Sequence, residues 1–141
     1  MEDRRIILNQ IKTPDGTILK SMHRHDYVTY IDANGLTYMV DGGTDYLRRN
    51  IQENLDQAYE ELTIYSDSPF ETIRENFHRG GRGKDGTEPL TWVPMSEMSD
   101  EWLLACIKYN EDRGIGDSFA SDMYKKELMY RQSNPELSIK D

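Results

Sequence analysis

The residues best suited to chemistry in this sequence lie in one basic, glycine-rich segment, residues 74–92. Arg79, Arg82 and Lys84 fall within it, and no carboxylate occurs between Asn76 and Lys84. Glycine occupies positions 80, 81, 83 and 86. A glycine-spaced backbone leaves N–H groups free to converge on an anion, and guanidinium groups add bidentate donors. The segment therefore indicates a binding site for a small anionic ligand; the alternative is a mobile surface loop.

The charge of the whole chain narrows what this segment can bind. The 141 residues carry 26 acidic and 17 basic side chains, for a formal net charge of −9. Such a field repels phosphates, which argues against bulk binding to nucleic acid or to an anionic membrane surface. Residues 1–50 are balanced in charge, so the excess of acids lies in residues 51–141, around the basic segment. A compact ligand held locally fits this distribution better than a long polyanion.

The composition also bears on the compartment. The single cysteine, Cys106, lies among Leu103, Leu104 and Ile107 and is expected to be a buried helix residue. A lone cysteine forms no disulfide within its chain, which fits a reducing cytosol. No apolar run reaches the roughly 20 residues of a membrane span, and the N-terminus lacks the apolar stretch of a signal peptide. We therefore expect a cytoplasmic protein.

The first part of the chain predicts antiparallel β-structure. Thr13-Pro14-Asp15-Gly16 and Ala33-Asn34-Gly35 have the composition of hairpin turns, and each separates two runs rich in β-branched and aromatic residues. The four runs together predict a meander. The predicted strands cover residues 5–11, 17–21, 27–32, 36–40, 60–66 and, in the second half, 90–94.

Residues 46–62 have two interpretations. Leu47, Ile51, Leu55 and Tyr59 recur every four positions, which favours a helix. The Leu47-Arg48-Arg49 stretch equally suits an extension of the sheet.

A short helix is expected in the middle of the chain. Ser68-Pro69 followed by Glu71 is typical of a helix start, with serine as N-cap and proline in the first helical position. Phe70, Ile73 and Phe77 mark one face of this helix. Gly80-Gly81 is expected to end it, so that the basic loop would leave its C-terminal end.

Two further helices are expected in the C-terminal part. Ser99 is expected to cap the first, with Asp100 and Glu101 near its positive end. Asp117 or Ser118 is expected to begin the second, which Asn134-Pro135 would end. The sequence thus predicts an α+β fold with an N-terminal antiparallel β-meander sheet, a short middle helix and two C-terminal helices. One domain is expected over residues 1–141: mainly β at 1–66, mainly α at 67–133 with a basic loop at 79–90, and a loose tail at 134–141.

The stretch His23-Arg24-His25-Asp26 resembles the start of a binuclear metallohydrolase motif. Such a motif needs further histidines and carboxylates, and His78 is the only other histidine in the chain. We therefore expect no metal centre. The alternative is a polar connection in which Arg24 and Asp26 pair with neighbours.

Three stretches, taken together, resemble a family of phage proteins. They are Arg24-His25-Asp26-Tyr27-Val28; Val40-Asp41-Gly42-Gly43 with Asp45-Tyr46-Leu47-Arg48-Arg49; and Gly83-Lys84-Asp85-Gly86 with Pro89-Leu90. Their order and spacing are similar to those of the first-described anti-Thoeris sponge proteins, and the likeness runs from about Arg5 to the last helix.

The resemblance implies a phage protein in the cytoplasm of an infected bacterium. Proteins of this family sequester cyclic ADP-ribose isomers made by TIR-domain defence enzymes, in pockets at a dimer interface and without cleaving them. Some members assemble into hexamers that hold cyclic oligonucleotides at separate sites. The implied partners are a glyco-cyclic ADP-ribose isomer, cyclic oligonucleotides and further copies of the chain as a homodimer or hexamer. No enzymatic activity and no cofactor are implied.

The chemistry of a cyclic ADP-ribose isomer then suggests roles for individual residues. Its pyrophosphate suits arginines and loop amides, and its adenine suits an aromatic ring. Phe77 is expected to stack on the base, Thr87 to make a polar contact, and Arg82 and Lys84 to hold the phosphates. Phe77 has a second interpretation as a core residue beside its helical neighbours.

Arg24 and Arg48 are further candidates, each for a ligand or only for the sheet edge. Two other functions stay open. The first is a phosphodiesterase that uses His23, His25 and Asp26, and the second is a phage adaptor that binds a host protein through its acidic helices.

Overall fold

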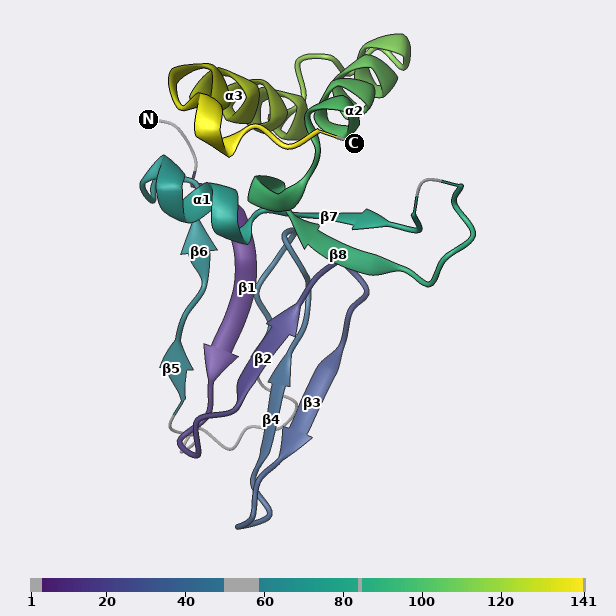
Figure 1. The fold of residues 1–141 in the computed structure, drawn as a ribbon. Coiled ribbons are helices and arrows are strands. Elements are labelled where there is room, and N and C mark those ends of the chain that lie inside the picture. The colour runs from purple at the N-terminus through teal and green to yellow at the C-terminus, as the bar shows by residue number, and fades with distance from the viewer. Residues whose placement is uncertain (1–3, 50–58, 84, 141) are drawn as a thin grey trace. The chain divides into compact units, whose positions relative to one another are not determined.

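A computed structural model describes residues 4–49, 59–83 and 85–140 of the chain (Figure 1). Contacts divide the chain into two compact units, Met1–Phe77 and His78–Asp141, and each is described by itself. Antiparallel strands dominate the first unit, and two long helices dominate the second. The predicted α+β fold class is confirmed.

One strand organises the sheet of the first unit. β1 (Ile6–Lys12) pairs with β2 (Ile18–Ser21) on one side, and with β5 (Glu60–Glu61) and β6 (Ile64–Tyr65) on the other (Figure 1). All these pairs are antiparallel. The predicted fifth strand is therefore present as two short pieces, and the register of β1 against β6 shifts between Ile6 and Leu8.

The next two strands form a hairpin of their own. β3 (Val28–Ile31) pairs with β4 (Thr37–Val40), with Val28 opposite Val40. The predicted meander is thus not continuous, since β2 and β3 share no ladder among the described residues. The reason lies in the connection between them. The Ser21 hydroxyl donates to the Asp26 carbonyl at 2.6 Å, and the Met22 amide donates to the Asp26 carboxylate at 2.8 Å, so these groups stabilise a turn.

The core of the first unit lies between the sheet that contains β1 and β2 and the hairpin of β3 and β4. Ile11 and Leu19 from the first pair contact Tyr38 and Val40 from the second, and all four side chains are buried. Burying each such side chain stabilises the fold by about 1.5–3 kcal/mol. Apolar packing, and not a shared ladder, therefore joins the two hairpins.

The middle helix differs from its prediction at both ends. α1 (Phe70–Asn76) has Pro69 as its N-cap residue without a side-chain hydrogen bond, so the expected serine cap is wrong. The helix ends before Phe77, whose backbone is extended, and not at Gly80-Gly81. Both glycines belong to β7 (His78–Gly81), where pairing with a second strand outweighs their helix-ending tendency.

The segment with two interpretations is only partly described. Arg48 forms an antiparallel bridge with Asp41, in which the Asp41 amide donates to the Arg48 carbonyl at 3.1 Å. Leu47-Arg48-Arg49 therefore extends the β-structure. Ile51 and Leu55, which suggested a helix, lie outside the described residues.

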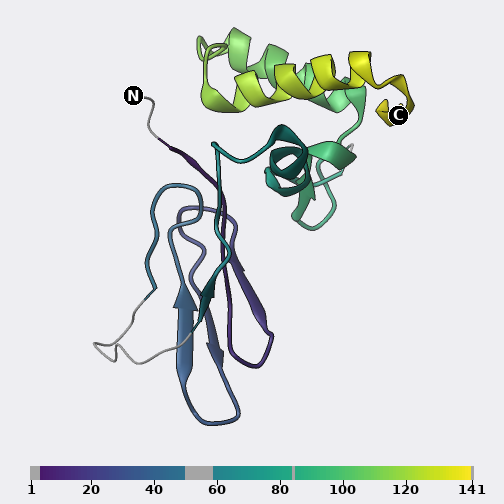
Figure 2. The same ribbon diagram turned by 90° about the vertical axis from the view of Figure 1, so that its left-hand side faces the viewer.

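The second unit contains a β-hairpin and two long helices. β7 pairs with β8 (Thr91–Pro94), which leads through a short 3-10 helix, η1 (Met95–Glu97), to α2 (Asp100–Asp112). α3 (Phe119–Ser133) lies beside α2 (Figure 1, Figure 2) and precedes η2 (Pro135–Leu137). No helix among the described residues is long and apolar enough to span a bilayer.

The predicted cap of the first long helix is confirmed, and Ser118, one of the two residues expected to begin the second, is the cap of that helix. The Ser99 hydroxyl accepts a hydrogen bond from the Trp102 amide, and the Ser118 hydroxyl accepts one from the Ser121 amide. Each cap satisfies a backbone donor that would otherwise lack an intrahelical partner. Leu103, Cys106 and Ile107 are buried, as the apolar spacing of the first helix predicts.

A buried ion network stabilises the second unit. Arg131, with 3% of its side chain exposed, donates to Glu127 and to Asp100, each at 2.7 Å, and also to the Met95 carbonyl at 3.1 Å. Asp100 in turn donates its amide to the Ile139 carbonyl at 2.8 Å. The residues after α3, expected to form a loose tail, are thus hydrogen bonded to the start of α2 as far as Ile139.

Arg131→Met is expected to lower the free energy of unfolding by about 3–5 kcal/mol, because it leaves two carboxylates without their buried partner. Denaturant unfolding measures this. Lys108→Ala is the control, since it breaks an exposed ion pair with Asp112 that is worth less than about 1 kcal/mol. An equal effect of the two substitutions would contradict a dominant role for the buried network.

Stability is also expected to depend on the protonation of Asp100. Burial by itself raises the pKa of this carboxyl, but hydrogen bonds from Ser138 and Arg131 outweigh burial and lower the pKa from 3.8 to about 2. The stabilisation is therefore complete above pH 3.8 and is lost as the pH falls through about 2. The difference in unfolding free energy between the wild type and Asp100→Asn should narrow from pH 5 to pH 2; a constant difference would contradict this.

Candidate functional site

The basic segment forms a β-hairpin. In the ladder between β7 and β8, Arg79 lies opposite Val93, Gly80 opposite Trp92, and Gly81 opposite Thr91. Residues 82–90 connect the two strands. The predicted loop at residues 79–90 is therefore shorter than expected, and its first part is regular strand.

The backbone of this connection is folded on itself. Gly83 and Gly86 have positive φ angles of 80° and 72°, which glycine adopts without strain. The Gly86 amide donates to the Gly83 carbonyl at 3.1 Å, and the Glu88 amide donates to the Arg82 carbonyl at 2.9 Å. These two amides are engaged within the connection and so are not available to an anion.

The side chains of the connection carry both charges. Arg82 and Thr87, two of the predicted ligand contacts, are exposed on it. The carboxylate of Glu88 lies against Gly83, where a Cβ atom would overlap it. Lys84, a third predicted contact, lies outside the described residues. The connection thus offers an exposed guanidinium group with a carboxylate nearby.

One face of the hairpin carries an aromatic ring, and the residue with that guanidinium group follows directly after the strand. A Cβ atom on Gly80 would lie 3.2 Å from Leu90 and 3.3 Å from the Trp92 ring, so both side chains cover this glycine. Arg82 lies directly after the end of β7, two positions beyond Gly80. We call Gly80, Arg82, Leu90 and Trp92 the Trp92 face. Trp92 is half-buried and Leu90 is 45% exposed.

The opposite face of the hairpin packs on the helices. A Cβ atom on Gly81 would lie 3.1 Å from the ring of Trp102 in α2. Arg79, on the same face, is half-buried and hydrogen bonded to Tyr124 of α3. Partial burial alone would lower the pKa of Arg79, but Tyr124 and Cys106 outweigh it and raise the pKa above its ordinary value. The guanidinium group therefore stays charged.

Phe77 lies in the first unit at the C-terminal end of α1. Its amide donates to the Ile73 carbonyl at 2.8 Å, and its side chain is half-buried. Ile73 is buried and Phe70 half-buried on the same helix. Phe77 thus closes the short helix, and the interpretation of its ring as a stacking surface stays a prediction.

Arg24 and Arg48 lie at one end of the first unit. The Arg24 side chain approaches Asp45 at 3.7 Å, and the Arg48 side chain approaches Asp41 at 3.8 Å. The Gly43 backbone lies against that of His23, which joins the connection after β2 to the segment after β4. Both guanidinium groups are more than half exposed. Each already has a carboxylate beside it, as the sheet-edge interpretation requires.

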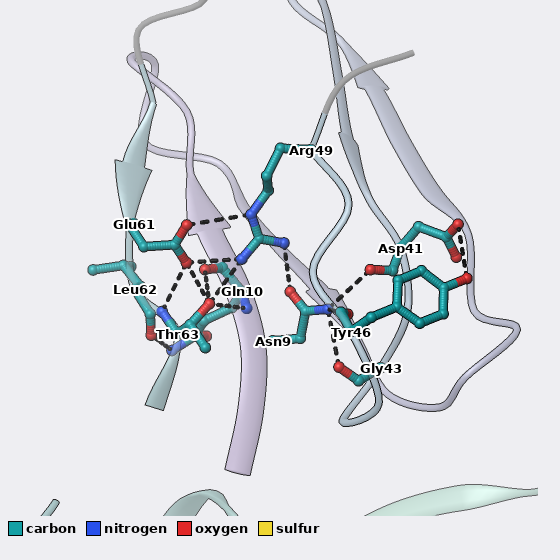
Figure 3. A network of polar contacts seen from close by, with 9 residues as sticks. All are labelled: Asn9, Gln10, Asp41, Gly43, Tyr46, Arg49, Glu61, Leu62 and Thr63. Carbon is teal, nitrogen blue, oxygen red and sulfur yellow. Dashed lines mark hydrogen bonds and ion pairs between the residues drawn. The ribbon is translucent and has the colours of Figure 1, made fainter. Parts of the chain in front are cut away.

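A buried amide fixes this end of the first unit (Figure 3). Asn9 is fully buried, and its Nδ2 atom donates to the carbonyls of Asp41 and Gly43 at 3.0 Å and of Tyr46 at 3.2 Å. Its Oδ1 atom accepts from Arg49, which also pairs with Glu61 at 2.8 Å. Asn9 was not among the residues predicted from the sequence, although a polar residue at an inward position of an apolar strand is a usable signal.

The same network explains the glycine pair after β4. Gly42 and Gly43 have positive φ angles of 105° and 53°, and a Cβ atom on either would overlap Tyr46 or His23. The Asp41-Gly42-Gly43 motif is therefore required for folding. Nothing in its geometry needs a ligand to account for it.

The histidine-rich stretch lies in the connection between β2 and β3. His23 and His25 are exposed, whereas the Asp26 carboxylate accepts the Met22 amide and stabilises the turn. In the part of the chain that the structure describes, no three His, Cys, Asp or Glu side chains form a group that could hold a metal ion.

Gly80→Val is expected to displace the Trp92 ring, because branched methyl groups would occupy the space that the ring and Leu90 fill. In a Trp102→Phe background, where Trp92 is the only tryptophan, its emission should shift to longer wavelength. Thr91→Val, on an exposed strand position, is the control. Unchanged emission in Gly80→Val would show that the ring does not cover Gly80.

No protein-family model, curated protein or solved structure matches the chain.

Proposed function

We propose that this protein binds and sequesters a cyclic ADP-ribose-type nucleotide without cleaving it, in the cytoplasm of a bacterium infected by a phage. The observation that carries the proposal is the Trp92 face. It combines an indole ring and an exposed leucine with an exposed guanidinium group in the connection that follows the strand. This combination suits a ligand that has both an aromatic base and a phosphate group.

Each part of the ligand has a counterpart on this face. A base that stacks on an aromatic side chain gains about 1–3 kcal/mol. A guanidinium group forms bidentate, charge-assisted hydrogen bonds with phosphate oxygens. Trp92 is thus the aromatic candidate on this face and Arg82 the phosphate contact, while Phe77 stays a separate candidate in the first unit. Thr87 and Lys84 complete the proposed set.

Charge limits the size of the ligand. The carboxylate of Glu88 against Gly83, together with the net charge of −9, opposes the approach of an extended polyanion. A compact cyclic nucleotide brings fewer phosphates than a nucleic acid does. Cyclic oligonucleotides are a second ligand class within the proposal.

Assembly into homodimers or hexamers is also part of the proposal. Ile31 and Met129 each leave 65% of their surface exposed, and Leu104 leaves 56%. Apolar side chains of this kind are suited to contacts between subunits. Light scattering of the purified protein measures the assembly.

The alternative phosphodiesterase is less well supported by the geometry. Its candidate carboxylate, Asp26, accepts a backbone amide in a turn, and both candidate histidines are exposed. A general acid or base works best where its surroundings adjust its pKa and hold it toward the substrate. Sequestration is therefore the preferred proposal.

Arg82→Ala is expected to reduce retention of a glyco-cyclic ADP-ribose isomer at least tenfold, because one charge-assisted contact of about 1.5–3 kcal/mol is lost. The protein is incubated with the nucleotide, filtered and heat-denatured, and the released molecules are identified by mass spectrometry. Glu88→Gln should retain more nucleotide, since it removes the nearby negative charge. Lys126→Ala, an exposed change on α3, is the control.

The outcomes separate the three functions. Intact nucleotide after denaturation supports sequestration, and a cleaved product would identify a phosphodiesterase. Absence of any retained nucleotide, with capture of one host protein, would favour the adaptor. Equal retention by Arg82→Ala and Lys126→Ala would remove the Trp92 face from the site.

A further inference from the structure

The outer edge of β3 carries backbone groups that have no partner in the part of the first unit that the structure describes. β3 forms a ladder with β4 and with no other described strand. In an antiparallel pair, the N–H and C=O groups of successive residues point alternately toward the partner strand and away from it. Every second residue of β3 therefore directs its backbone groups away from β4.

The hydrogen bond next to the turn decides which residues these are. The Asp32 amide donates to the Leu36 carbonyl at 3.0 Å, so Asp32 directs its groups toward the other strand of the hairpin. By alternation, Thr29 and Ile31 direct theirs outward. Among the described residues, the outward amides and carbonyls of Thr29 and Ile31 form no backbone hydrogen bond.

This edge also lacks the features that usually protect an edge strand. Charged side chains, proline or a bulge prevent an exposed edge from pairing with another chain. Residues 27–31 contain no charged residue and no proline, and the register of β3 against β4 is regular. Thr29 is exposed, Ile31 is 65% exposed and Tyr27 is 50% exposed. Such an edge suits the addition of a further strand through backbone hydrogen bonds.

A second copy of β3 matches this edge. Two copies related by a twofold axis pair in an antiparallel manner, so that each contact between them occurs twice. With Tyr30 on the axis, Thr29 of each copy lies opposite Ile31 of the other. The outward amides and carbonyls of the two chains then bond one another. Thr29 and Ile31 are both β-branched, and such side chains pack well across neighbouring strands.

Charge favours this register. If the strands were shifted so that Thr29 lay on the axis, Asp26 would face Asp32 of the second copy, and directly opposed like charges are destabilising. The opposite shift would place Thr29 against the turn, where the strand has ended. With Tyr30 on the axis, Asp26 faces Asn34, and no two carboxylates are opposed. A chain with a net charge of −9 can thus bring two uncharged strands together.

We propose that this protein forms a homodimer in which β3 pairs antiparallel with β3 of a second copy. The pairing joins the two β3–β4 hairpins into one continuous sheet, and a sheet of more than two strands is more stable than an isolated hairpin. The inference rests on the assembly that the proposed function includes, and it specifies the surface of that contact. It does not depend on the nucleotide or on the Trp92 face.

Hydrogen exchange of single amides, followed by NMR at several protein concentrations, tests the surface. The amides of Thr29 and Ile31 are expected to exchange at least about tenfold more slowly in the dimer than in the dilute monomer, because each gains a carbonyl partner. The Tyr30 amide, which belongs to the ladder with β4, should be protected at every concentration. Light scattering gives the oligomeric state under the same conditions.

Paired charge substitutions test the register. Thr29→Glu with Ile31→Glu opposes carboxylates across the axis and should raise the Kd of the dimer at least about tenfold. Thr29→Lys with Ile31→Glu opposes unlike charges and should preserve the dimer. Thr44→Glu with Gln132→Glu is the matched control, since it adds the same two acids at exposed positions outside β3, and it should leave the Kd unchanged. Protection of the Tyr30 amide shows that the β3–β4 hairpin stays folded in each variant.

The outcomes separate this proposal from the others. A wild type that stays monomeric at millimolar concentration would overturn it, together with the assembly in the proposed function. A dimer in which the Thr29 and Ile31 amides exchange as fast as in the monomer would overturn this surface alone. Equal dissociation by Thr29→Lys with Ile31→Glu, or by the control, would also overturn it. Retention of the cyclic nucleotide, measured separately, decides the binding proposal whatever the outcome here.

Discussion

The second unit depends on the close approach of Gly81 to Trp102. A Cβ atom at this position would lie only 3.1 Å from the indole ring, so a glycine lets β7 run directly along α2. This contact fixes which face of the hairpin meets the helices. Strand alternation then assigns Arg79 to the helical side and Trp92 to the other. Because Gly81 has no side chain, the face of the hairpin with Arg79 packs on the helices, and the face with Trp92 points away from them.

A polar contact has the corresponding role in the first unit. The buried Asn9 amide holds three backbone carbonyls after β4 and accepts from Arg49, so a segment without regular structure becomes fixed. A buried amide stabilises only when its donors and acceptor are satisfied. Because Asn9 meets that condition, the neighbouring Arg48 has a defined position beside Asp41. The apolar core lies between the hairpins, and polar contacts stabilise this end of the unit instead.

The arginines of this acidic chain differ in the groups that they contact. Arg131 and Arg49 pair with carboxylates, and both are nearly buried. Arg79 and Arg113 contact tyrosines, and Arg82 is exposed on the connection between β7 and β8. A paired guanidinium group contributes to folding, because its charge is neutralised within the chain. A guanidinium group that forms no ion pair with a carboxylate keeps its donors available for a ligand.

Local chemistry in the sequence determined the α+β class, the hairpin turns and the serine caps of both long helices, because these features depend on neighbouring residues. It also indicated the basic segment as a place for an anion. Only the tertiary structure decided that Gly80 and Gly81 lie in a strand, since pairing with a distant segment overrode their tendency to end a helix. Trp92, Arg79 and Asn9 likewise gained their neighbours from contacts between residues far apart in the chain, and no local pattern specifies such contacts.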